Sequence, residues 1–155
     1  MANQFYVVKI PFTAVPTSNL DRYEDAFHDC VLRGVVAFLD NHRDIVEKLR
    51  LADADEFRDR YRGDSFGALE RIRNIVGADK LMVLVDEYDR APMKLFAGLA
   101  PKLDRHDIEA VLEPVTDPLS GLLATLKALG ARYYVTGIFT VPGLARCRSS
   151  TTTKT

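Results

Sequence analysis

The sequence lacks the patterns that most directly mark a zinc site, a secreted protein or a membrane protein. Its two cysteines, Cys30 and Cys147, are far apart, and no CxxC motif or Cys/His cluster is present, so neither a zinc site nor a disulfide framework is indicated. No apolar run approaches the roughly 20 residues that span a bilayer. The N-terminus has no basic segment before a long apolar core, which argues against a secretory signal. We therefore expect an intracellular, cytoplasmic protein with no membrane partner.

An excess of charge of one sign is also lacking. The chain carries 21 basic and 22 acidic residues, for a formal net charge of −1, and the two signs are interspersed. This balance does not favour nucleic acid as the main partner. With 155 residues, of which 47% are hydrophobic and 28% charged, the chain suits one globular domain. We assign residues 1–145 to this domain and expect the polar residues 146–155 to form a disordered tail.

Three short apolar runs are expected to be strands: residues 5–10 (FYVVKI), 81–85 (LMVLV) and 132–138 (RYYVTGI). They are rich in β-branched and aromatic residues, and the first two show little alternation between apolar and polar positions. Strands that are apolar on both faces are typical of a parallel sheet covered by helices. Helical patterns separate the runs, which favours parallel pairing through helical crossovers. The sequence therefore predicts an α/β fold with a parallel sheet flanked by helices.

Four helical segments are expected from apolar spacing, N-cap residues and stop signals. They are a helix from Asn19 or Asp21 to Asp40, a charged stretch over residues 44–62, a helix from Asp64 or Ser65 to the stop at Gly77, and a helix that starts at Thr116-Asp117-Pro118 and stops at Gly130.

The strongest chemical signal follows the second apolar run, which leads directly into Asp86 and Glu87. In a parallel sheet, ligands bind beyond the carboxyl ends of the strands. An acid that ends a strand is held rigidly and can reach, usually through water, a Mg²⁺ that bridges nucleotide phosphates. The acid beside it can orient or polarise an attacking water. Two adjacent carboxylates repel each other unless they share a cation, which favours a metal there.

Two other interpretations of this acidic pair remain open from the residues alone. Strand-end acids also cap a following helix or lie in a solvated turn, and acids can perform other acid/base work. The third run adds Thr136, followed by Gly137, at the tip of the neighbouring strand. A hydroxyl there could contact a terminal phosphate or its water. Taken alone, however, the pattern fits a purely structural interpretation better, as a β-branched strand residue followed by a turn glycine.

Three segments resemble one known family when they are read in order. Residues 80–96, KLMVLVDEYDRAPMKLF, are similar to the Walker B segment of the AAA-ATPase-like family of P-loop NTPases. Residues 5–15, FYVVKIPFTAV, are similar to its strand and turn before the first long helix. Residues 122–144 are similar to its helix and sensor-1 strand. The resemblance covers roughly residues 5–144 and is specific only in DEYDRAP and YYVTGI.

The resemblance implies a role for three residues and two ligands. Asp86 corresponds to the acid that coordinates Mg²⁺, Glu87 to the acid that activates water, and Thr136 to sensor 1. The implied cofactors are Mg²⁺ and ATP. Arg90 stands where the family often has lysine.

The phosphate-binding loop of that family has no counterpart in the sequence. No GxxxxGK[ST] motif occurs, and none of the nine glycines is followed by lysine. That loop holds the nucleotide phosphates with backbone N–H groups and a lysine. In the family it precedes the strand that FYVVKI resembles, so we expect a partial domain whose sheet exposes edges and apolar surface. We expect such a chain not to hydrolyse ATP efficiently alone, and either to form a homo-oligomer, to pair with a complementary protein or to be poorly stable.

Three functions follow as hypotheses. The first is an AAA-type ATP-binding domain that retains the Walker B and sensor-1 elements. The second is a non-catalytic interaction module derived from such a domain. The third is an unrelated enzyme that uses Asp86, Glu87 and Asp89. A second acidic group, Asp53-Ala54-Asp55-Glu56, lies in a charge-rich helical stretch and is interpreted as a solvated helix face.

Overall fold

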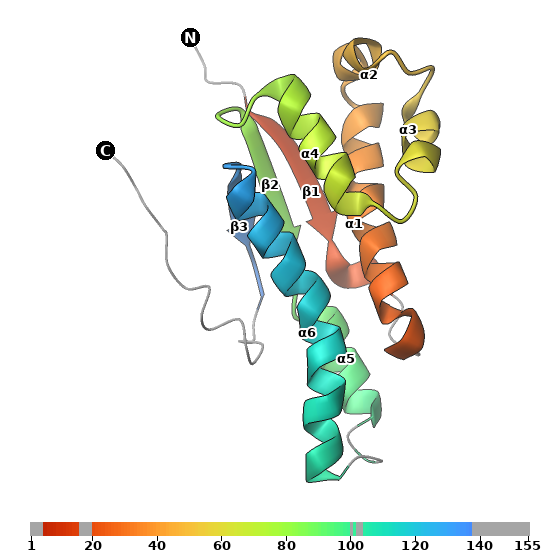
Figure 1. Ribbon diagram of the computed structural model, residues 1–155, viewed down its shortest axis with the longest axis vertical. Helices are drawn as coiled ribbons and strands as arrows, with labels where there is room; N and C mark the ends of the chain where they lie inside the picture. The colour runs from red at the N-terminus through yellow and green to blue at the C-terminus, as the bar shows by residue number, and fades with distance from the viewer. Residues whose placement is uncertain (1–4, 16–19, 100, 102–103, 138–155) are drawn as a thin grey trace, which may run out of the picture.

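The sheet at the centre of the fold has three parallel strands. The computed structural model describes residues 5–15, 20–99, 101 and 104–137. The strands β1 (Tyr6–Pro11), β2 (Leu81–Asp86) and β3 (Arg132–Val135) lie in the order β1-β2-β3, as Figure 1 shows. This confirms a mixed α/β fold with a parallel sheet. The expected tail at 146–155 and position 138 of the third run lie outside the described residues.

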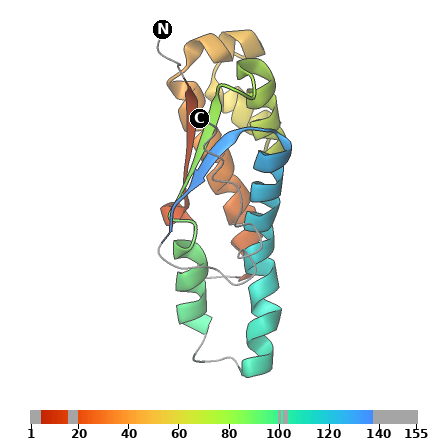
Figure 2. The same ribbon diagram turned by 90° about the vertical axis from the view of Figure 1, so that its left-hand side faces the viewer.

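Helices pack on one side of this sheet. Figures 1 and 2 show α1, α4 and α6 on the same side, while α5 continues beyond the carboxyl end of β2. Within the described ranges, no helix is long and apolar enough to cross a membrane. The helices are α1 (Tyr23–Asp40), α2 (Arg43–Leu49), α3 (Ala54–Arg60), α4 (Ser65–Val76), α5 (Arg90–Leu99) and α6 (Arg105–Ala128), with short 3₁₀ turns η1 (Phe12–Ala14) and η2 (Leu20–Arg22).

The two faces of the sheet differ in burial. Val8 on β1 and Val83 on β2 are fully buried against the helices. Val7 and Tyr134, which point to the opposite face because strand side chains alternate, are 39% and 59% exposed. A sheet apolar on both faces was expected to be covered on both, but the described helices cover only one. We call the other side the open face; paired positions across it are Lys9, Leu84 and Tyr134.

Local signals fixed some helix ends as expected. Asp64 caps α4, because its Oδ1 accepts a hydrogen bond from the Gly67 amide at 2.9 Å. Gly77 ends that helix with a φ of 92°, in the region that favours glycine. At α1 the expected cap Asn19 lies outside the described residues, and Asp21 lies in η2, just before the helix begins at Tyr23.

The single helical stretch expected over residues 44–62 is wrong, because the chain breaks it into α2 and α3. Arg50 adopts a left-handed φ of 57°, and Leu51 follows as a buried side chain. Asp53 then caps α3 by accepting a hydrogen bond from the Glu56 amide at 2.9 Å. The break allows apolar side chains of both short helices to face the core. The burial of these side chains stabilises the fold more than one continuous, solvated helix would.

The expected helix start at Thr116-Asp117-Pro118 is also wrong, because α6 begins eleven positions earlier. Asp104 and Asp107 form its N-terminal cap; the Asp104 amide donates to Asp107 Oδ2 at 3.3 Å. Pro114 and Pro118 lie inside the helix despite the lost backbone hydrogen bonds. A continuous buried stripe offsets that cost. Its members are Val111, Val115, Leu119, Leu122 and Leu126.

Close packing of α1 on β1 depends on Gly34. A Cβ atom at this position would lie 2.6 Å from the Lys9 carbonyl oxygen, which is backbone and cannot move aside cheaply. We therefore expect Gly34→Ala to lower the free energy of unfolding by about 1–3 kcal/mol, as overpacking does. Urea denaturation measures this change.

Gly98 provides the matched control for that substitution. It also lies in a helix, but a Cβ atom there would meet nothing within 4 Å. Gly98→Ala should leave the protein as stable or raise the free energy of unfolding by up to about 1 kcal/mol through helix propensity. Equal stabilities of the two variants would contradict the close contact between α1 and β1.

Candidate functional site

The candidate site lies where β2 and β3 end. Asp86 is the last residue of β2 and pairs with Pro11 of β1. Thr136 directly follows β3, and its amide donates to the Val85 carbonyl at 2.8 Å. The Tyr88 amide in turn donates to the Thr136 carbonyl at 3.2 Å. These backbone bonds fix the chain after β2 against the end of β3.

Both oxygens of the Asp86 carboxylate are engaged. The Thr136 hydroxyl donates to Oδ1 at 2.7 Å, and Lys9 Nζ lies 3.3 Å from Oδ2. The Asp86 side chain remains 40% exposed. The Thr136 hydrogen bond, followed by that from Lys9, lowers the pKa of Asp86 below its ordinary value, because both partners favour the charged form. Asp86 is therefore ionised at neutral pH.

Glu87 is held in an unusual backbone conformation. Its φ is 52°, a left-handed value that is uncommon for residues other than glycine. The Glu87 amide donates to the Thr136 hydroxyl oxygen at 3.3 Å, so one side chain binds two consecutive residues after β2. Arg90 Nη1 lies 2.8 Å from Glu87 Oε2. Backbone strain of this kind is common at functional sites.

Each acid thus has its own cation within the chain. Lys9 neutralises Asp86, and Arg90 neutralises Glu87. The expectation that like-charge repulsion favours a shared metal is therefore weakened, since two side chains already relieve that repulsion. Both pairs are largely exposed to solvent, and pairs of this kind contribute little to stability. A competing ion or phosphate can displace them at low cost.

Asp89 differs from the two preceding acids because it is buried, with 3% of its surface exposed. Gly137 allows this close approach: a Cβ atom there would lie 2.5 Å from Tyr88 Cε1 and 2.8 Å from Asp89 Oδ1. The geometry therefore gives Asp89 a place inside the loop after β2. It does not offer Asp89 to a substrate beside Asp86 and Glu87, as the hypothesis of an unrelated enzyme requires.

Sequence reasoning missed Lys9 and gave Arg90 no role. Lys9 lies two positions before Pro11, which pairs with Asp86, so alternation along β1 places it on the same face as that acid. This signal becomes usable only when the register between the strands is known. Arg90 starts α5, three residues after Glu87, and the expected arrangement left this segment without a helix.

The donor set suits a metal that brings most of its own ligands. Among the described residues, no group of three or more His, Cys, Asp or Glu side chains could hold an ion. Mg²⁺ usually keeps several waters and takes one or two carboxylates plus substrate phosphates. Asp86, with Thr136 fixing its orientation, fits that requirement. These side chains do not fit a metal that is held by protein ligands alone.

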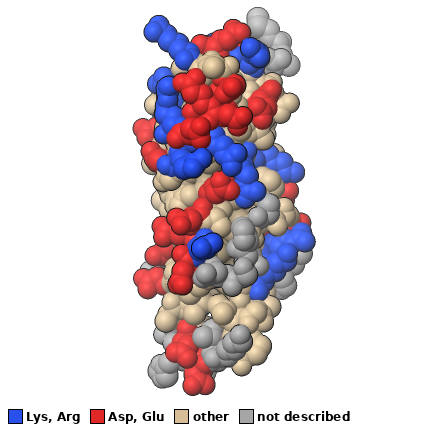
Figure 3. Space-filling view, turned by 90° about the vertical axis from the view of Figure 1, so that its right-hand side faces the viewer, with Lys and Arg blue, Asp and Glu red and all other residues tan. Residues whose placement is uncertain are grey.

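Other charged groups have structural explanations. The Asp53–Glu56 segment is a helix cap, since the Glu56 carboxylate also accepts from the Ala52 amide at 2.8 Å. Figure 3 shows basic and acidic side chains mixed over one face of the molecule. Asp29 on α1 contacts Arg33 on the same helix at 3.0 Å and Arg58 on α3 at 3.8 Å.

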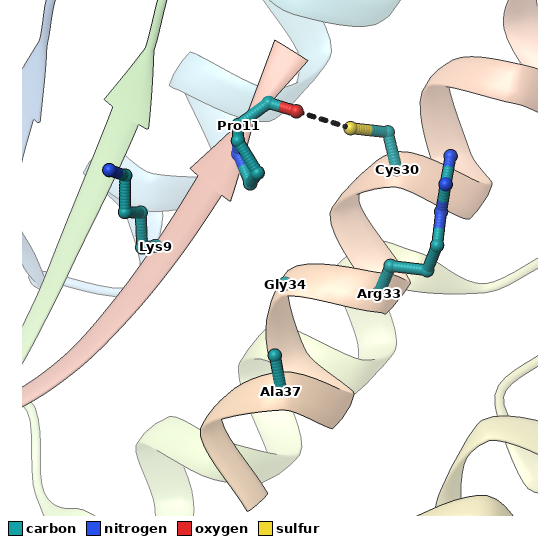
Figure 4. A pocket seen from close by; sticks show the side chains of 6 residues that line it. All are labelled: Lys9, Pro11, Cys30, Arg33, Gly34 and Ala37. Atoms are coloured by element: carbon teal, nitrogen blue, oxygen red, sulfur yellow. Dashed lines mark hydrogen bonds between the residues drawn. The ribbon is translucent and has the colours of Figure 1, made fainter. Parts of the chain in front are cut away.

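A groove of about 350 Å³ lies between β1 and α1, shown in Figure 4. The Cys30 thiol donates to the Pro11 carbonyl at 3.1 Å, and burial raises the pKa of this thiol to about 11. In Figure 4, Lys9 points toward β2 and Arg33 points away from β1, so neither charged group is aimed into the groove. The groove is lined by Lys9, Pro11, Cys30, Arg33, Gly34 and Ala37.

Comparison with known proteins identifies no relative: no family model, curated protein or solved structure matches this chain.

The role of Thr136 in setting the Asp86 charge can be tested directly. Thr136→Val removes the hydroxyl but keeps the β-branched shape, so the pKa of Asp86 should rise toward its ordinary value. Thr136→Ser keeps the hydroxyl and should hold the pKa low. Carboxyl chemical shifts followed by NMR during a pH titration measure both. An unchanged pKa in Thr136→Val would contradict the assigned hydrogen bond.

The same variants should differ in their response to acid. Because the native pKa of Asp86 lies below its unfolded value, its contribution to stability is present above the unfolded pKa and is lost as the pH falls through the native pKa. Thr136→Val should therefore lose less stability than the original protein over that acidic range. Urea denaturation at several pH values below 5 tests the direction.

Proposed function

We propose that this chain is an ATP-binding domain of AAA type that retains the Walker B and sensor-1 elements of a P-loop NTPase. One observation carries the proposal: the Thr136 hydroxyl, at the end of β3, binds the Asp86 carboxylate, at the end of β2, at 2.7 Å. This places a rigid, ionised acid and a hydroxyl side by side at the carboxyl edge of a parallel sheet, where nucleotide phosphates bind in open α/β folds.

Each residue has a distinct part in this proposal. Mg²⁺, when bound, would neutralise charge on the nucleotide phosphates. Asp86 would hold that ion directly or through water with its Oδ2 oxygen, while Thr136 keeps the carboxylate oriented through Oδ1. Glu87 would orient a water near the phosphates, since it follows Asp86 on a chain fixed by Thr136.

Binding without hydrolysis is the more specific form of the proposal. Arg90 lies 2.8 Å from Glu87 Oε2, and its positive charge makes this carboxylate a weaker base toward water. The sequence also contains no GxxxxGK[ST] motif to grip the β- and γ-phosphates. We propose that a complementary protein supplies that grip, and that this chain alone does not hydrolyse ATP.

Calorimetric titration with ATP and Mg²⁺ tests the nucleotide site. The original protein should show saturable binding, and Asp86→Asn should abolish it, because the amide keeps the shape but removes the charge that holds the ion. Asp59→Asn is the matched control. Asp59 is also an exposed acid paired with an arginine, Arg62 at 3.2 Å, but it lies on α3, away from the strand ends.

The negative outcome is equally informative. Absence of binding at millimolar ATP and Mg²⁺, from protein shown to be folded by circular dichroism, would refute a nucleotide site in this chain alone. Equal losses in Asp86→Asn and Asp59→Asn would indicate a general effect of surface charge instead of a specific site.

The open face supports a second candidate function, a non-catalytic interaction module. Val7 and Tyr134 are 39% and 59% exposed on that face, and Val135, on the edge strand β3, is 36% exposed. Exposed apolar side chains gathered on one face are typical of protein interfaces. This function does not require nucleotide chemistry at Asp86.

Self-association distinguishes the two functions. If the open face pairs two copies, sedimentation velocity should show a concentration-dependent dimer that Tyr134→Lys weakens at least about tenfold, as loss of a central aromatic does. Asp86→Asn should leave the dimer unchanged if the module is independent of nucleotide. A monomer at all concentrations would exclude a homo-oligomer built through this face.

A further inference from the structure

Lys9 occupies the one oxygen of Asp86 that Thr136 does not bind. Thr136 donates to Oδ1 at 2.7 Å, while Lys9 Nζ lies 3.3 Å from Oδ2. A divalent ion that binds Oδ2 directly would therefore compete with the ammonium group for that oxygen. Register explains the position, because Lys9 lies on the open face two residues before the partner of Asp86.

We propose that Lys9 makes the Asp86 site select a divalent ion complexed with a polyphosphate over the free ion. This inference rests on the proposed function and adds a residue that sets its specificity. The ammonium group repels a free divalent ion and competes with it for Oδ2. A polyphosphate reverses that effect. The phosphate oxygens accept hydrogen bonds from the ammonium group of Lys9, and the divalent ion then binds Asp86 in place of Lys9.

The exposure of the pair makes such an exchange possible. The side chains of Lys9 and Asp86 are 61% and 40% exposed, and ion pairs this exposed are weak. Lysine is a flexible point charge with rotatable donors, so it can move from the carboxylate to a nearby phosphate without disturbing the strand. Figure 4 shows Lys9 extending from β1 toward β2, in the direction of the strand that ends at Asp86.

Three variants separate the charge of Lys9 from general surface charge. Lys9→Met removes the ammonium and keeps much of the apolar stem, whereas Lys9→Arg keeps the charge. Lys48→Met is the matched control, because Lys48 lies 3.6 Å from Asp44 in a similarly exposed pair, 56% and 54% exposed. Thermal unfolding of each variant verifies that the fold is kept.

Binding of Mn²⁺ alone is the first measurement, through paramagnetic broadening of the Asp86 and Glu87 amide signals in NMR. We expect Lys9→Met to bind Mn²⁺ about 3- to 10-fold more tightly, because a nearby positive charge is removed at moderate screening. ATP without metal should bind Lys9→Met more weakly by a similar factor. Lys9→Arg and Lys48→Met should match the original protein in both titrations.

The outcomes separate this inference from the proposed function. If the original protein binds ATP with Mg²⁺ but Lys9→Met binds Mn²⁺ no more tightly, Lys9 has no selective role and only the inference is overturned. If no variant binds either Mn²⁺ or ATP, the inference and the proposed function both fail. An equal gain in Mn²⁺ affinity for Lys48→Met and Lys9→Met would also overturn the inference, since the effect would then be one of net charge.

Discussion

The burial of β2 determines where the acids of the candidate site can lie. Its inward side chains Leu81, Val83 and Val85 are fully buried against the helices, and parallel ladders to β1 and β3 hold the strand on both sides. Because successive side chains alternate, Asp86 must then point to the open face. A slip of one residue would bury its charge and expose Val85, so the hydrophobic core itself fixes the position of the carboxylate.

Hydrogen bonds to backbone, more than ion pairs, organise the site around that carboxylate. The Thr136 hydroxyl accepts a hydrogen bond from the Glu87 amide and donates one to Asp86. The backbone of Thr136 is hydrogen-bonded to the backbone of Val85 and Tyr88. These contacts support the left-handed backbone at Glu87, which would otherwise be costly. The two cations add charge balance but little rigidity, because both ion pairs are exposed.

Short sequence patterns predicted the strands and some of the helix ends, because these depend on neighbouring residues in the chain. The three strands, the cap at Asp64 and the stop at Gly77 follow from short apolar runs and from the needs of helix ends. The closeness of Asp86 and Thr136 follows from two strands that end at the same edge. The contact between Lys9 and Asp86 could not be predicted, because it depends on the register between β1 and β2.

The errors in the helical regions have a common physical origin. The break at Arg50 and the early start of α6 are decided by which apolar side chains reach the core. Pro118 carries a strong local start signal, yet the buried stripe that includes Val111 and Val115 continues through it. Tertiary burial outweighs a local preference when several buried side chains oppose one unfavourable backbone position.

The two candidate functions use the same side of the molecule. Lys9 and Tyr134 both pair with Leu84, in one row across the open face. Asp86 lies two residues after Leu84, at the carboxyl end of β2. A protein that covers Tyr134 would also reduce the solvent around Lys9 and Asp86. Electrostatic interactions strengthen as water is removed, so such a partner would tighten the Lys9–Asp86 pair and make it harder for an ion or phosphate to displace. Under the two proposed functions, partner binding and nucleotide binding would therefore oppose each other through desolvation of Lys9 and Asp86, even if no residue of the partner touched the nucleotide.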